Sequence, residues 1–189
     1  MTLNPNPSMT AEAFEAFLKQ PVRGNRLWEL IEGQLIERGN TREQGMIVSR
    51  ILYLLYNHTH KHDRGQVAMS IWHHQAGDLY NVRMPNIAYY AAATRPVVKE
   101  VFASIYPDLV VEVKALDEDE TAITGRGLFY LTRGTKIVWL VYPDQRLIDV
   151  MTNNSIKTLA SGNVLTGGDI LPKFSVPVAD IFQLAPSGS

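Results

Sequence analysis

The sequence predicts an α/β fold of the mixed α+β kind, in which a central mixed sheet is flanked by helices. Three observations lead to this prediction. Residues 42–62 repeat apolar side chains at a helical spacing, residues 105–116 contain a run of β-branched apolar residues, and short strand-like segments lie on both sides of that run. The order is helix, hairpin, long helix, several strands, helix and hairpin, which is typical of helices packed on a mixed sheet.

The N-terminal part predicts a short helix followed by a β-hairpin. Thr10 can cap a helix over residues 11–20, because its hydroxyl can accept a hydrogen bond from a free backbone N–H of the first turn. Residues 26–38 then alternate between apolar and polar side chains and turn at Glu32-Gly33, which indicates a hairpin.

The remaining elements follow from the same two periodicities. A long helix is expected at 42–62, followed by strands at 66–72, 79–84 and 86–90, and a turn at 76–78 joins the first two of these strands. After a polar connection at 91–100 come the strand at 105–116, a helix at 121–131 and a hairpin at 136–152. Short strands then end in a turn of helix at 176–182. We expect one domain over residues 10–184, with flexible tails at 1–9 and 185–189.

Composition excludes several classes of protein. The 189 residues carry a net charge of −1, so no global basic field draws the chain to nucleic acid, and a DNA contact would need a local basic patch. The chain has no cysteine, which excludes disulfides and thiolate zinc sites. No apolar run is long enough to span a membrane, and the N-terminus does not read as a signal peptide. We therefore expect a cytoplasmic protein without a membrane partner.

Charged residues interrupt the central strand at regular places. Asp108, Glu112 and Lys114 are separated by even numbers of residues, so on a regular strand they point to one face. Glu112 and Lys114 would lie roughly 7 Å apart, whereas Asp108 would lie roughly 13 Å from Glu112 and marks the start of the strand instead.

The Glu-x-Lys pattern at 112–114 allows two interpretations. In a phosphodiesterase, the carboxylate holds Mg²⁺, the metal activates a bound water, and the lysine stabilises negative charge. The alternative is an edge strand whose polar face meets water. Because residues 109–113 are apolar on both faces, a central strand is favoured, and charges there are expected to be paired or functional.

Several segments, taken in order, resemble the Uma-two-type family of putative restriction endonucleases, which has the PD-(D/E)XK nuclease fold. The segments are WELIEGQLIE (28–37), REQGMIVSRI (42–51), MPNIAYY (84–90), YPDLVVEVKA (106–115), GLFYLTRGTKIVWLVYP (127–143) and LTGGDILPKFSVPVADIF (165–182). The resemblance covers about residues 10–182, and it implies a restriction-endonuclease-like mixed sheet with an N-terminal helix and hairpin.

The resemblance also implies a set of site residues. The family's acidic positions and lysine fall on Glu29, Asn86, Glu112 and either Lys114 or Arg126. Together with the Val113 carbonyl, the first three would surround one Mg²⁺, for which Mn²⁺ can substitute, while Lys114 would stabilise charge and Arg126 would be a second cation.

Two departures from the family pattern matter for activity. The family's Pro-Asp is Pro85-Asn86 here, and its usual histidine after the first hairpin is Gln44. An asparagine offers a carbonyl oxygen but no charge, so it weakens a site for a hard divalent ion. Two functions therefore stay open: an Mg²⁺-dependent DNA endonuclease, and a catalytically inactive homodimer that uses the fold to bind nucleic acid or a partner.

Other candidate sites have simpler explanations. His58 and His62 are spaced i, i+4 on the long helix and could hold zinc, or they could be a polar helix end. Arg126, Arg133 and Lys136 could form the local basic patch that DNA needs, or they could be scattered surface cations.

Overall fold

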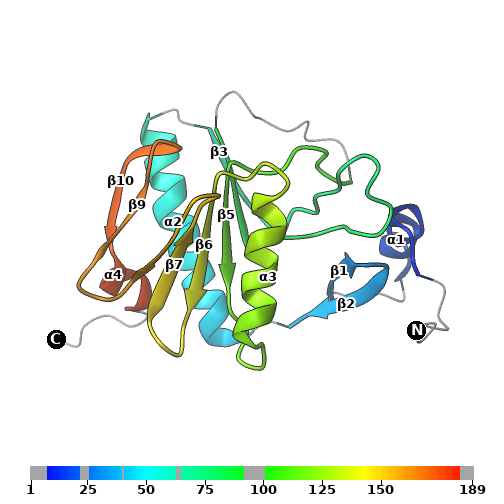
Figure 1. The fold of residues 1–189 in the computed structure, drawn as a ribbon, viewed down its shortest axis with the longest axis horizontal. Coiled ribbons are helices and arrows are strands. Elements are labelled where there is room, and N and C mark those ends of the chain that lie inside the picture. The colour runs from blue at the N-terminus through cyan, green and yellow to red at the C-terminus, as the bar shows by residue number, and fades with distance from the viewer. Residues whose placement is uncertain (1–7, 22–25, 40, 63–64, 92–100, 184–189) are drawn as a thin grey trace.

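A computed structural model of the chain describes residues 8–21, 26–39, 41–62, 65–91 and 101–183 (Figure 1). The helices are α1 (Ala11–Leu18), α2 (Arg42–His62), α3 (Glu120–Leu131) and α4 (Val178–Phe182). The strands are β1 (Leu27–Ile31), β2 (Gln34–Arg38), β3 (Gln66–Met69), β4 (Ile87–Tyr90), β5 (Leu109–Val113), β6 (Ile137–Tyr142), β7 (Leu147–Met151), β8 (Ile156–Leu159), β9 (Val164–Gly167) and β10 (Leu171–Pro177).

The central sheet has six strands in the order β3-β4-β5-β6-β7-β8. Only β5 and β6 run parallel, and α3 is the crossover helix that such a parallel pair requires. The hairpins β1-β2 and β9-β10 are separate two-stranded sheets. The predicted mixed sheet flanked by helices is therefore confirmed.

The two faces of the sheet are covered by different helices, as Figure 1 shows. On one face, Ile47 and Ile51 of α2 pack with Val111 and Val113 of β5. On the other face, Ile123 of α3 packs with Val110. Because strand side chains alternate, Glu112 lies on the same face as Val110, beneath α3.

The strand predicted at 79–84 does not form. Its alternating residues are used by single bridges, in which Val82 pairs with Leu30 of β1 and Arg83 pairs with His73. The strand predicted at 66–72 ends at Met69, since the next residue, Ser70, has a left-handed φ of 53°. The partner of β3 is β4, so the predicted hairpin around residues 76–78 is wrong.

Chain ends and one connection lie largely outside the described residues. Of the predicted tail 1–9, only residues 8 and 9 are described, and Met9 donates its N–H to the Gly33 carbonyl at 2.8 Å. The tail 185–189 and most of the predicted connection 91–100 lie outside the described residues, and the single domain over 10–184 stays a prediction. Within the described segments, no helix has the length and apolarity needed to cross a membrane.

Candidate functional site

Two buried glutamates from distant parts of the chain meet beneath α3. Glu29 of β1 is 1% exposed and Glu112 of β5 is fully buried. The bridge between Leu30 and Val82 holds β1 against the segment that leads into β4, and there the Met84 N–H donates to Glu29 Oε1 at 2.7 Å. The hairpin is thereby fixed with its carboxylate pointing toward the centre of the sheet.

A single arginine joins these two carboxylates. Arg38 at the end of β2 donates from Nη1 to Glu29 Oε2 at 3.1 Å and from Nη2 to Glu112 Oε2 at 2.9 Å. The hairpin register places it there: Glu29 pairs with Ile36, so Arg38, two residues further along β2, is the diagonal neighbour of Glu29 on the same face.

A second arginine reaches Glu112 from α3. Arg126 Nε lies 3.4 Å from Glu112 Oε2. The same guanidinium forms a two-pronged ion pair with Glu118, in which Nη2 donates to Oε2 at 2.8 Å and Nη1 donates to Oε1. Glu29, Arg38, Glu112, Arg126 and Glu118 therefore form one chain of alternating charges.

The electrostatics of this chain stabilise its charged form. Burial alone would raise the pKa of Glu29, but Arg38, Arg83 and Arg126, with the Met84 N–H, outweigh burial and hold that pKa below its usual value. Burial opposes the charge of Arg38, yet Glu112 and Glu29 raise its pKa well above the ordinary value. Both glutamates are paired with Arg38 in this arrangement.

Asn86 and the Val113 carbonyl, two of the predicted metal ligands, are engaged in backbone contacts. Asn86 Oδ1 accepts from the Val113 N–H at 2.8 Å, which extends the pairing of β4 and β5 through a side chain. The Val113 carbonyl accepts from Gln44 Nε2 at 2.7 Å, and Gln44 is itself buried at the start of α2. Gln44 thus ties α2 to the end of β5.

Lys114 does not join the carboxylate pair. It follows the last residue of β5, its N–H donates to the Val141 carbonyl at 2.9 Å, and its Nζ pairs with Asp144 Oδ2 at 3.3 Å. Among the described contacts the cation that reaches Glu112 is therefore Arg126, not Lys114, and the catalytic role expected of Lys114 stays a prediction. Asp108 directly precedes β5 and accepts from the Ala91 N–H, as a residue at the strand's start would.

Sequence reasoning missed Arg38 and Tyr130. The relation of Arg38 to Glu29 follows from the two-residue turn at Glu32-Gly33, so counting along the hairpin could have found it. Tyr130 of α3 gave no signal. Burial, together with Glu112 and Glu29, raises its pKa well above the usual value, and its hydroxyl has no hydrogen-bond partner within the described residues.

A cavity of about 220 Å³ opens beside the pair. Glu29, Arg38 and Arg126 line its floor, and Glu37, Asp117 and Glu118 are the other charged residues in its wall. Carboxylates outnumber cations there, so the opening does not present the positive surface that a phosphate backbone needs.

The residues at the site do not fit the Mg²⁺ ion that the resemblance implies. Carboxylate oxygens are the right type of ligand. However, across the described segments no group of three or more His, Asp or Glu side chains could hold a metal. Among the expected ligand atoms, only Glu112 Oε1 lacks a partner, while the other oxygens accept from Arg38, Met84, Val113 or Gln44. The guanidinium between the carboxylates already supplies positive charge.

The other predicted sites are also occupied by local contacts. His58 Nε2 lies 3.1 Å from the Pro172 carbonyl, and the rings of His58 and His62 lie 4.9 Å apart without a third ligand among the described residues. Arg133 pairs with Asp78 at 2.8 Å, and Lys136 pairs with Asp108 at 2.7 Å. The cations predicted as a basic patch are therefore ion-paired.

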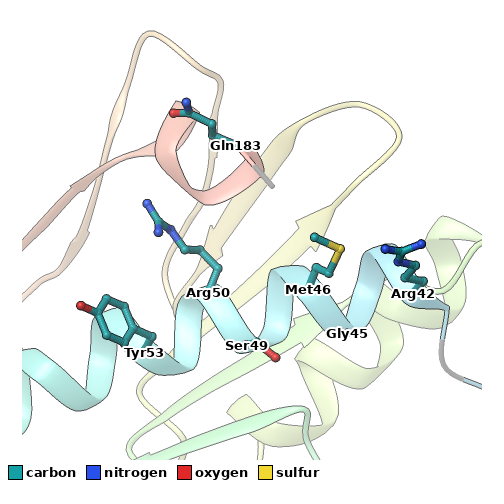
Figure 2. Close-up of a pocket in the computed structure, with 7 residues that line it drawn as sticks. All are labelled: Arg42, Gly45, Met46, Ser49, Arg50, Tyr53 and Gln183. Atoms are coloured by element: carbon teal, nitrogen blue, oxygen red, sulfur yellow. The ribbon is translucent and has the colours of Figure 1, made fainter. Parts of the chain in front are cut away.

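A larger concave region lies along the outer face of α2 (Figure 2). Its volume is about 760 Å³, and its lining consists of Arg42, Gly45, Met46, Ser49, Arg50, Tyr53 and Gln183. Within the part of the chain that the structure describes, neither Arg42 nor Arg50 forms a side-chain hydrogen bond or ion pair. Tyr53 and Tyr56 are more than half exposed on the same helix, and His60 stacks on Tyr56 with ring centroids 5.6 Å apart.

Comparison with known proteins agrees with this fold. The family model described as "Putative restriction endonuclease" (Uma2) matches residues 14–179. This chain belongs to the Uma2 family. A crystal structure of a putative nuclease belonging to DUF820 from Anabaena variabilis ATCC 29413 superposes with a TM-score of 0.75 at 18% identity, covering 83% of this chain and 90% of that chain. A search of curated proteins found no match. Family and fold thus place this Uma2 chain among proteins of nuclease type.

Proposed function

We propose that this Uma2 chain is a nucleic-acid-binding protein built on the nuclease fold, and that its carboxylate pair does not direct metal-dependent cleavage. The observation that carries the proposal is the Arg38 guanidinium, which contacts both Glu29 and Glu112 within 3.1 Å. The carboxylate oxygens that would face a metal ion face a fixed cation instead.

Two replacements support the same conclusion. Asn86 stands where the family has an aspartate, so a charged ligand is lost, and its side-chain oxygen is engaged by the Val113 N–H. Arg126 stands where many members have a helical lysine. A guanidinium group is planar and binds carboxylates with two parallel hydrogen bonds. The guanidinium of Arg126 is paired in this way with Glu118.

The outer face of α2 supports nucleic-acid binding. Among the described residues, Arg42 and Arg50 form no side-chain hydrogen bond or ion pair. They line one concave region with the exposed ring of Tyr53, and Tyr56 is exposed on the same helix. Arginines neutralise phosphates, and aromatic rings stack on bases, with about 1–3 kcal/mol for each stacked base. Single-stranded DNA presents both groups, so it is the expected ligand, and the cytoplasm is the location that we propose along with it.

The resemblance also implies a homodimer, which we include in the proposal. Sedimentation equilibrium at micromolar concentration is expected to give twice the chain mass of 21.2 kDa.

Binding and cleavage are tested separately. Fluorescence anisotropy with a labelled 20-nucleotide single strand is expected to show binding that weakens with salt, and Arg50→Ala is expected to lower the slope of log affinity against log salt by about 0.7. Arg26→Ala is the matched control, since Arg26 is an exposed arginine on the hairpin that pairs with Glu37. Equal loss in both variants, or no binding by wild type, would contradict the proposed function.

The second candidate is an Mg²⁺-dependent DNA endonuclease, in which Mn²⁺ can substitute. One observation favours it: Glu112 Oε1 is buried and has no hydrogen-bond partner among the described residues. Plasmid nicking by wild type in 10 mM MgCl₂ that disappears in Glu112→Gln would establish this candidate. Intact plasmid with both proteins is the outcome that the proposed function requires.

A further inference from the structure

We infer that Arg38 is a built-in substitute for a divalent cation, and that its removal exposes a latent Mg²⁺ or Mn²⁺ site between Glu29 and Glu112. The inference extends the proposed function and rests on it in one respect, namely that the wild-type carboxylate pair does not bind metal. It concerns what keeps the pair together and what else could do so.

Arg38 divides its two terminal nitrogens between two carboxylates. A guanidinium usually grips one carboxylate with two parallel bonds. Arg38 instead gives Nη1 to Glu29 and Nη2 to Glu112, so its charge lies between the carboxylates of two different strands. A cation that bridges two carboxylates is also the arrangement of a metal ion held by two acidic ligands.

The two buried carboxylates need a cation beside them. Both are at most 1% exposed, so water cannot screen their mutual repulsion and a neighbouring positive charge must offset it. Arg126 cannot replace Arg38 in this role, because it touches only Glu112, at 3.4 Å, and gives its two terminal nitrogens to Glu118. Arg38 is the one described cation hydrogen-bonded to both glutamates.

Removal of the Arg38 guanidinium would free oxygens on both carboxylates. Glu29 Oε2 and Glu112 Oε2 would lose Arg38, while Arg126 Nε would stay 3.4 Å from Glu112 Oε2, and Glu112 Oε1 has no hydrogen-bond partner among the described residues. Mg²⁺ commonly binds through one or two carboxylates and keeps several waters. The adjoining cavity of about 220 Å³ gives those waters space, so two glutamates suffice as protein ligands.

The test uses Arg38→Met, which keeps much of the apolar stem and removes the charge, with Arg26→Met as the matched control on the same hairpin. Calorimetry with MnCl₂ is expected to show about one Mn²⁺ bound per chain for Arg38→Met and none for wild type or Arg26→Met. At a hundredfold excess over Kd, Mn²⁺ is expected to raise the melting temperature of Arg38→Met by roughly 5–10 °C. Adding Asn86→Asp to Arg38→Met is expected to tighten Mn²⁺ binding.

A double variant keeps the inference testable if Arg38→Met does not fold. Arg38→Met/Glu112→Gln removes one of the two negative charges that repel one another. This double variant is therefore expected to melt at a higher temperature than Arg38→Met in EDTA and to lose the response to Mn²⁺. If Arg38→Met stays unfolded in MnCl₂, or folds and ignores Mn²⁺, the latent site is overturned.

The outcomes separate this inference from the proposed function. Binding of Mn²⁺ by wild type at the same site would overturn both, because the guanidinium would then not replace the metal. Binding by neither wild type nor Arg38→Met would overturn the latent site alone and leave the nucleic-acid proposal standing.

Discussion

Neutralising Glu112 in the wild-type chain gives a sharp prediction about stability. In a metal-free pair of carboxylates without a bound cation, removing one negative charge relieves repulsion, and the protein becomes more stable. Here Glu112 is fully buried, accepts from Arg38 at 2.9 Å and lies 3.4 Å from Arg126. Glu112→Gln keeps the shape of the side chain but leaves part of the charge of both arginines uncompensated inside the protein.

The size of the effect follows from the burial of the pair. Removing one partner of a buried ion pair costs about 3–5 kcal/mol, because the remaining charge loses its partner without regaining water. For a chain of this size, each kcal/mol lowers the melting temperature by about 2–4 °C. Glu112→Gln is therefore expected to melt roughly 6–20 °C below wild type.

Thermal and urea unfolding in EDTA measure this change. Glu37→Gln is the control, since Glu37 pairs with Arg26 at 3.0 Å with both side chains well exposed, and such pairs contribute about 0–1 kcal/mol. A melting temperature for Glu112→Gln equal to or above that of wild type would refute the reasoning, because it would mean that the carboxylate is not balanced by the two arginines.

Two further predictions concern other buried parts of the molecule. Burial lowers the pKa of His73 from 6.5 to about 4. The folded protein therefore takes up the imidazole proton only at a lower pH than the unfolded chain does, and the free energy of unfolding falls as the pH drops from 6.5 toward 4. The contribution at pH 5 is about 2 kcal/mol, and urea unfolding should show it as a smaller loss between pH 8 and pH 5 in His73→Gln than in wild type. Gly127→Ala would place its Cβ 2.8 Å from Met151 Sδ and 3.3 Å from Leu140 Cδ2, so it should cost about 1–3 kcal/mol. Gly125→Ala meets nothing within 4 Å on the same helix and should stabilise the protein by up to about 1 kcal/mol, so equal effects at the two glycines would contradict the packing of α3.

The larger elements of the fold could be predicted because each carries its own periodicity. Helix α2 has 21 residues and buries one face from Gln44 to Thr59, and the five residues of β5 are buried on both sides. The segment 79–84 alternates as clearly as a strand, but alternation says only which side chains share a face. It does not identify the partner, and here the partners are single residues of β1 and of the preceding loop.

The candidate site could be predicted only in part. Even spacing along the strand predicts that Glu112 and Lys114 share a face, but it does not say which partner each side chain takes, and Lys114 pairs with Asp144. Arg126 reaches Glu112 because α3 packs across β5, which is a tertiary contact that spacing along the chain cannot give.

Arg38 and Asn86 are best understood together, through the charge they bring to the carboxylate pair. The family resemblance implies an aspartate where Asn86 stands, so Asn86 brings one negative charge fewer, and Arg38 places one positive charge between Glu29 and Glu112. Because the two strands hold both glutamates in a buried place, the fold needs a positive charge beside them. In the proposal made above, the covalently attached charge of Arg38 fills this need in place of a metal ion.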